Sequence, residues 1–184
     1  MTEINKPSLK VFLCHASSDK DAVRILHQRL IDDGIDAWLD DRKLLPGQKW
    51  RMEISKAVKN ADVVIICLSK NSITKEGYVQ SEINFALDVA YEKPEDTIFL
   101  IPAKFEDCDV PNRLADWQWV NLFSNRESLD EIGYSKLQRS LSIRAENIGA
   151  AIPRLSNKRA QKAQILEFAD LILDIQTRQA LRGN

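Results

Sequence analysis

Residues 63–68, Val-Val-Ile-Ile-Cys-Leu, form an unbroken apolar run rich in β-branched side chains. A strand with one face in water alternates apolar and polar residues, whereas a continuously apolar strand is covered on both faces. The run therefore predicts a central strand of a parallel sheet with helices on both sides. Residues 9–14 and 97–102 have the same apolar character and predict two further strands.

Helical periodicity alternates with these strands along the chain. Shorter strands are expected at 35–39 and 116–122, with Trp117 and Trp119 of the latter in the core. Four helices are expected: one begins after residue 19, and the others cover about residues 50–60, 79–90 and 134–148. The side chains expected to be buried on the first and last of these are Val23, Leu26, Leu30 and Ile31, then Leu137, Leu141 and Ile148. The alternation of five strands with helices predicts an α/β fold with a five-stranded parallel sheet of the flavodoxin-like order and right-handed crossovers.

The turns after the first and third strands are polar. Ser17, Ser18 or Asp19 is expected to cap the first helix, which should end at residues 32–34, Asp-Asp-Gly. Ser69–Gly77 is expected to be a loop whose hydroxyl groups can also cap a helix. In a flavodoxin-like sheet, ligands bind outside the carboxyl ends of the strands at the switch point. Residues 16–19 and 69–77 are therefore expected to surround one crevice.

Glu82 lies on the helix that follows this loop. Val79, Ile83, Ala86, Leu87 and Ala90 form the apolar stripe of that helix. Glu82 falls at the edge of the stripe, with Tyr78 and Phe85 as its neighbours on the helix surface. A carboxylate held there is partly desolvated and attracts a cationic ligand. The alternative is that Glu82 points past both rings into water.

Composition excludes several other classes of function. With 26 basic and 27 acidic residues the net charge is −1, so a nucleic-acid-binding surface is not expected. No run is apolar enough to cross a bilayer and no signal segment begins the chain, which predicts a cytoplasmic protein without membrane contact. Cys14, Cys67 and Cys108 are expected to be reduced structural thiols. With only two histidines, no metal site is expected.

Two segments are candidates for contacts with other molecules. The connection 40–49 is long and carries Leu44 and Leu45, which either meet a partner or fold back on their own domain. Residues 1–8 are expected to be a leader, 9–150 the domain, and 151–184 a helical extension. The extension has an apolar stripe that either packs on a partner, a second copy or a further module, or folds back. Acidic residues Glu106, Asp107 and Asp109 are expected in a solvated loop, since the alternation of a calcium loop is absent.

Several enzyme motifs are absent from the sequence. There is no Gly-x-Gly-x-x-Gly after the first strand, no phosphate-binding Gly-x-x-x-x-Gly-Lys-Ser/Thr and no Gly-x-Ser-x-Gly. The first strand ends in Cys14-His15 and the third in Leu68-Ser69, so the acidic phosphoryl-transfer site of a response-regulator receiver is missing. His15 has no evident nucleophile partner.

The sequence from residue 10 to about residue 148 resembles a Toll/interleukin-1 receptor (TIR) domain of the bacterial kind. The resemblance rests on Val-Phe-Leu-Cys-His-Ala-Ser at 11–17, Trp-Leu-Asp-Asp at 38–41, Leu-Leu-Pro-Gly at 44–47, and residues 69–87 with Glu82. The family pattern Trp-x-x-x-Glu is matched with Tyr78 in place of tryptophan.

The resemblance implies an NAD+ glycohydrolase or cyclase that cleaves the nicotinamide–ribose bond. It implies Glu82 as the catalytic residue, with Ala16, Ser17 and Tyr78 against NAD+, which is a substrate rather than a cofactor. It also implies self-association through the Leu44–Gly47 loop, and an anti-phage role in a bacterium. Two other interpretations remain open, namely a non-catalytic TIR interaction module and an N-glycoside enzyme such as a nucleoside deoxyribosyltransferase.

Overall fold

A five-stranded parallel sheet forms the centre of the protein, seen in a computed structural model that describes residues 6–39, 49–74, 78–125 and 128–152. Its strands are β1 (Lys10–Cys14), β2 (Asp36–Leu39), β3 (Val63–Leu68), β4 (Leu100–Lys104) and β5 (Val120–Asn121). They lie in the order β2-β1-β3-β4-β5, and every pair is parallel. The predicted flavodoxin-like order is confirmed. Residues of β3 are all buried, as expected for the central strand.

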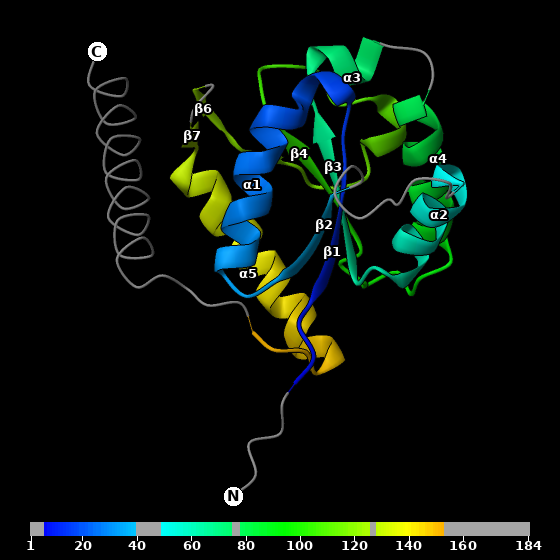
Figure 1. The fold of residues 1–184 in the computed structure, drawn as a ribbon, viewed down its shortest axis with the longest axis vertical. Coiled ribbons are helices and arrows are strands. Elements are labelled where there is room, and N and C mark those ends of the chain that lie inside the picture. The colour runs from blue at the N-terminus through cyan, green and yellow to red at the C-terminus, as the bar shows by residue number, and fades with distance from the viewer. Residues whose placement is uncertain (1–5, 40–48, 75–77, 126–127, 153–184) are drawn as a thin grey trace, which may run out of the picture. The chain divides into compact units, whose positions relative to one another are not determined.

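Helices cover both faces of the sheet. They are α1 (Lys20–Asp32), α2 (Trp50–Asn60), α3 (Lys70–Thr74), α4 (Tyr78–Tyr91) and α5 (Glu131–Ile148), with single 3-10 turns η1 (Ser17–Asp19) and η2 (Asn112–Leu114). Helices α1 and α5 lie on one side of the strands, and α2 and α4 on the other (Figure 1). A hairpin of β6 (Phe123–Asn125) and β7 (Ser128–Leu129) follows β5.

Alternate residues of each strand supply two separate cores. Leu13, Ile65 and Cys67 pack with α1 and α5, whereas Phe12, Ile66 and Leu68 pack with α2 and α4. This division follows from the two-residue period of a strand. Because both faces of the sheet are covered by helices, both sets of alternate residues in the central strands must be apolar. Burial of both sets is the main favourable contribution to the free energy of folding.

A buried polar cluster joins the end of α1 to α5. The Asp33 carboxylate accepts hydrogen bonds from the Tyr134 hydroxyl at 2.6 Å and from Gln138 Nε2 at 2.5 Å. The Arg29 guanidinium binds Glu131 through two hydrogen bonds and lies 3.7 Å from the centroid of the Tyr134 ring. Asp33 was predicted only to help end α1, because its partners lie about a hundred residues away in the sequence.

Some helix ends agree with the sequence prediction and others do not. Gly34 has a φ of 85° directly after α1, as expected for a residue that ends a helix. No side chain among Ser17, Ser18 and Asp19 caps α1, because the chain forms η1 there and the Asp19 carboxylate binds Ser69 instead. The predicted loop after β3 contains the short helix α3. Ser69 Oγ accepts a hydrogen bond from the Ser72 amide and so caps α3, whereas the helix expected after the loop, α4, begins at Tyr78.

The predicted fifth strand was too long, and three side chains expected in the core are exposed. Only Val120 and Asn121 pair with β4, Trp117 is half-buried, and Trp119 is 41% exposed. Ile31 and Ile148 also face water, because each lies at the last turn of its helix beyond the packed stripe. Strand β4 begins three residues later than predicted, and α5 three residues earlier. Val23, Leu26, Leu30, Leu137 and Leu141 are buried as predicted.

Contacts divide the chain into two compact units, Met1–Arg154 and Leu155–Asn184, and all the described residues lie in the first. The Leu44–Gly47 loop and the 153–184 part of the predicted C-terminal extension lie outside the described residues. No helix in the described ranges is long and apolar enough to cross a bilayer.

Candidate functional site at the carboxyl edge of the sheet

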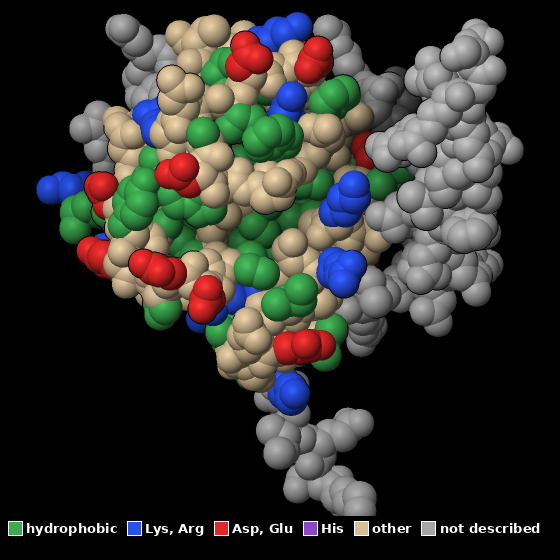
Figure 2. Space-filling model, turned by 180° about the vertical axis from the view of Figure 1, so that it is seen from behind, with side chains coloured by type: hydrophobic (Ala, Val, Ile, Leu, Met, Phe, Trp, Pro, Cys, Tyr) green, Lys and Arg blue, Asp and Glu red, His purple; other side chains and the backbone are tan. Residues whose placement is uncertain are grey.

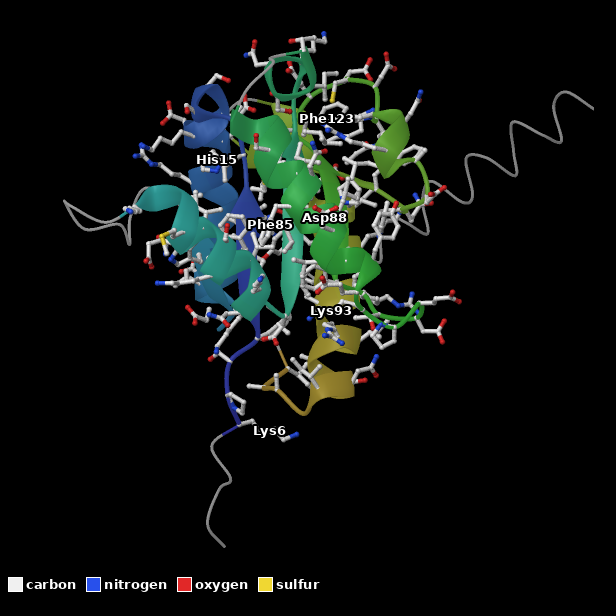
Figure 3. The ribbon with its side chains drawn as sticks, turned by 90° about the vertical axis from the view of Figure 1, so that its right-hand side faces the viewer. Lys6, His15, Phe85, Asp88, Lys93 and Phe123 are labelled. Carbon is white, nitrogen blue, oxygen red and sulfur yellow. The ribbon has the colours of Figure 1, made fainter. Side chains whose placement is uncertain are left out.

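The carboxyl ends of β1, β3 and β4 meet at one edge of the sheet. Cys14 pairs with Ile66, and Leu68 pairs with Lys104, so the segments that follow these strands leave the sheet close together. His15, at this edge, and Lys6, near the amino edge, mark the two ends of β1 in Figure 3. The edge is the switch point at which ligands bind in folds of this class.

A crevice of about 560 Å³ opens at this edge on the α1 side of the sheet. Its apolar floor includes Ile25, Phe105 and Leu129. Four carboxylate residues, Asp19, Asp21, Glu106 and Asp107, line it, and no described residue that lines it is basic. The prediction that residues 16–19 and 69–77 surround one crevice is confirmed only in part, since Ser18, Asp19, Ser69 and Asn71 line it and the predicted nucleotide contacts Ala16 and Ser17 do not.

A hydrogen bond joins the two polar turns that border the crevice. Ser69 Oγ donates to Asp19 Oδ2 at 2.6 Å, which ties the turn after β1 to the turn after β3. The Lys70 amide donates to Glu106 Oε1, which brings the segment after β4 to the same place. The sequence did not predict that Glu106 lines this crevice, because Glu106 was expected in a solvated loop. The signal that could have found it is its position two residues after the end of a parallel strand.

Burial perturbs a thiol below this crevice. Cys67 is 1% exposed, and its burial, assisted by the Asp19 carboxylate, raises the pKa of the thiol well above its ordinary value. All three cysteines are free and buried, which confirms the prediction of reduced structural thiols. The pKa of Cys108 is raised as well, mainly by burial.

This raised pKa predicts a loss of stability in alkali. The neutral Cys67 thiol stabilises the folded state fully below the unfolded pKa, and this contribution is lost as pH rises from there toward the folded pKa. The free energy of unfolding should fall by about 1.4 kcal/mol per pH unit for this thiol above about pH 8.5. Urea titrations of wild type and Cys67→Ala at several pH values measure this. The variant should show the shallower alkaline decline, and parallel curves would contradict the assignment.

The predicted site residues belong to two segments, with Ala16 and Ser17 after β1 and Tyr78 and Glu82 in the first two turns of α4. Ala16 is 2% exposed directly after β1, and Ser17 is exposed at the start of η1. Tyr78 is the first residue of α4 and Glu82 lies in its second turn, while the side chains of both lie outside the described part of the molecule. Because α4 begins after β3 and runs back along the sheet, Glu82 lies near the carboxyl edge.

Helix α4 and the acidic crevice lie on opposite faces of the sheet. Ile83, Ala86 and Leu87 pack in the core that α4 shares with α2, whereas Ile25 and Leu129 of the crevice pack with the α1 core. Phe85, predicted to neighbour Glu82, is half-buried and lies between α4 and α2 (Figure 3), with Lys59 Nζ 5.8 Å from its ring centroid. Among the described residues, no three or more His, Cys, Asp or Glu side chains are arranged so that they could hold a metal ion, and this includes the carboxylates of the crevice.

Comparisons with known proteins identify the family to which the chain belongs. The family model described as "TIR domain" matches residues 11–138. The chain belongs to the TIR domain family. A solved TIR domain, from the Toll-related Receptor TRR-2 of Hydra magnipapillata, has a TM-score of 0.58 and 20% sequence identity. The alignment covers 71% of this chain and 96% of that one, and it supports the fold.

Two curated bacterial relatives carry the name 2' cyclic ADP-D-ribose synthase. BtTIR of Bacteroides thetaiotaomicron is 35% identical over 74 residues, which are 40% of this chain and 25% of that protein. AbTIR of Acinetobacter baumannii (strain 1295743) is 32% identical over 87 residues, which are 43% of this chain and 32% of that protein. The chain spans about a fifth to a third of the length of the curated relatives it matches.

Proposed function

We propose that this chain cleaves the nicotinamide–ribose bond of NAD+, as a glycohydrolase or cyclase, with Glu82 as the catalytic residue. Membership of the TIR family and the names of the two bacterial relatives support the activity. The position of Glu82 carries the proposal, because the second turn of α4 brings the backbone of an acidic residue to the edge where ligands of this fold class bind.

Cleavage of the nicotinamide–ribose bond of NAD+ needs only one carboxylate. Nicotinamide in NAD+ is positively charged, so it leaves with the bonding electron pair as a neutral molecule and needs no general acid. The ribose then develops oxocarbenium character, which the Glu82 carboxylate stabilises electrostatically. Water adds to the anomeric carbon to give ADP-ribose, or a hydroxyl group of the same molecule adds to give a cyclic product; a proton is released in both cases. NAD+ is the substrate, and the scheme uses no further cofactor.

Ala16, Ser17 and Tyr78 are proposed to hold the nucleotide. Because the Ala16 side chain is buried, its contribution comes from its backbone, whereas the exposed Ser17 offers a hydroxyl group. Tyr78 precedes Glu82 by one helical turn and supplies an aromatic ring for stacking.

Self-association is proposed to activate the enzyme, through the Leu44–Gly47 loop, and a sensor or partner contacts the C-terminal extension. Exposed aromatic surface near β5 supports such contacts: Trp119 is 41% and Tyr91 69% exposed. Apolar side chains also gather in the middle of the face shown in Figure 2. We place this enzyme in the bacterial cytoplasm, where assembly at infection would consume NAD+ in defence against phage.

A dilution series tests the dependence on assembly. If a complete site needs neighbouring copies, nicotinamide released per molecule of protein should fall by about tenfold or more across a hundredfold dilution through the dissociation range. Chromatography of the products of NAD+ measures this directly. Constant specific activity over the whole range would show that one chain suffices.

The same product analysis tests the proposed reaction. Release of nicotinamide together with linear or cyclic ADP-ribose supports it. Free base released from deoxynucleosides, with no reaction of NAD+, would instead indicate a deoxyribosyltransferase. A folded, concentrated protein that leaves both substrates unchanged would indicate a TIR domain that acts only by binding.

A further inference from the structure

A second hollow lies at the other end of the sheet, between β2 and α2. It has a volume of about 300 Å³, at the lower end of the range for small-molecule sites. The residues that line it come from three elements. They include Lys10 and Phe12 of β1, Asp36 and Trp38 of β2, and Glu53 and Lys56 of α2.

Its floor is an aromatic pair. Phe12 and Trp38 are directly opposite each other on neighbouring strands, and their ring centroids are 5.0 Å apart. Phe12 is fully buried, whereas Trp38 is only half-buried. Because β2 is the edge strand, no further strand covers this pair. The open part of the indole ring is therefore a stacking surface for a planar ligand.

The charges on the rim indicate the sign of that ligand. Glu53 and Lys56 neutralise each other through an ion pair of 2.9 Å, and Asp36 is already engaged in an interaction. The Lys10 backbone amide donates to the Asp62 carboxylate at 2.8 Å, and Asp36 is directly opposite Lys10 on β2. Within the described ranges, no ion pair engages the Lys10 ammonium group. Lys10 lies on the same face of the sheet as Phe12, two residues before it, so the unpaired positive charge is next to the aromatic floor.

From this geometry we infer a second ligand site in which a small aromatic anion stacks on Trp38 and pairs its carboxylate or phosphate with Lys10. The site is separate from the proposed NAD+ site, because Lys10 and Cys14 are at opposite ends of β1, roughly 13 Å apart at the strand rise per residue. The two ends of β1 lie toward Lys6 and toward His15 in Figure 3. This inference does not depend on the reaction that the protein catalyses.

Three ring-matched probes separate stacking from charge. Indole-3-acetate, neutral indole and cationic tryptamine share one ring system and differ in charge. NMR titration of the full chain, followed at the Trp38 indole N–H signal, should show saturable binding of indole-3-acetate with a dissociation constant of the order of 1 mM, as expected for a ligand of this size. Tryptamine should bind at least about tenfold more weakly.

Variants locate the site. Lys10→Gln, a surface change, should weaken binding of indole-3-acetate about tenfold and leave indole unaffected. Trp38→Leu lacks the indole reporter, so its titration is followed at the backbone amide signals of Lys56 and Ala57, and it should bind neither ligand. Lys70→Gln, an exposed lysine on α3 at the other end of the sheet, is the matched control and should bind like wild type. Thermal unfolding checks that each variant is folded. The inference is overturned if no probe binds the wild type, if the anion and cation bind equally, or if Lys10→Gln binds like wild type.

Discussion

Replacing Glu82 with glutamine should lower nicotinamide release from NAD+ by at least about a hundredfold. Glutamine keeps the size and the hydrogen-bonding oxygen of the side chain and removes only its negative charge. If Glu82 stabilises the positive ribose in the transition state, kcat should fall much more than KM rises, because the interaction strengthens as the bond breaks. Nicotinamide should be quantified at a protein concentration at which the wild type is active.

The control for this variant lies on the same helix. Asp88 is exposed on α4, so Asp88→Asn removes one negative charge of α4 without touching the proposed site. Its activity should remain within about twofold of wild type, since exposed charges interact weakly through water. Both variants should unfold at wild-type urea concentrations. Full activity in Glu82→Gln, or an equal loss in Asp88→Asn, would remove Glu82 from the mechanism.

Gly133→Ala should destabilise the protein by about 3 kcal/mol or more. A Cβ atom at this position would lie 1.7 Å from the Asn121 carbonyl oxygen and 2.9 Å from its carbon, both of which belong to the backbone of β5. Alanine gains about 1 kcal/mol in helix propensity over glycine. The clash outweighs this gain, because α5 and the end of the sheet must move apart and leave the core beneath them incompletely packed.

Urea unfolding followed by circular dichroism measures the effect. Ser135→Ala is the matched control, two residues further along α5, and should change the free energy of unfolding by less than about 0.5 kcal/mol. A Gly133→Ala protein as stable as wild type would show that α5 does not approach β5 this closely.

The fold was predictable where one local pattern decided the structure. A continuous apolar run has few ways to be satisfied other than burial between two layers, so β1 and β3 and the order of the sheet followed from sequence. The fifth strand was not predictable in length, because the alternation of residues 116–122 is also compatible with an irregular segment in which only Val120 and Asn121 reach a partner. The predicted capping of the start of α1 was wrong, because the carboxylate of Asp19, one of the expected caps, accepts a hydrogen bond from a distant residue, Ser69.

The candidate site was predictable in position but not in detail. Topology alone places the turns after β1 and β3 together, which residues such as Ser18 and Ser69 confirm. The position of Glu106 two residues after β4 could have indicated that it reaches this edge, but no local pattern specifies its hydrogen bond from the Lys70 amide. Likewise, the position of Lys10 close to Trp38 depends on the register of β1 against β2.

The location of bound NAD+ tests the central claim most directly. A crystal structure of Glu82→Gln soaked with NAD+ should show the nicotinamide–ribose bond beside residue 82, with the Ser17 turn and Tyr78 against the nucleotide. A nucleotide bound in the acidic crevice on the α1 face, with its ribose remote from α4, would contradict the assignment of Glu82 as the catalytic residue.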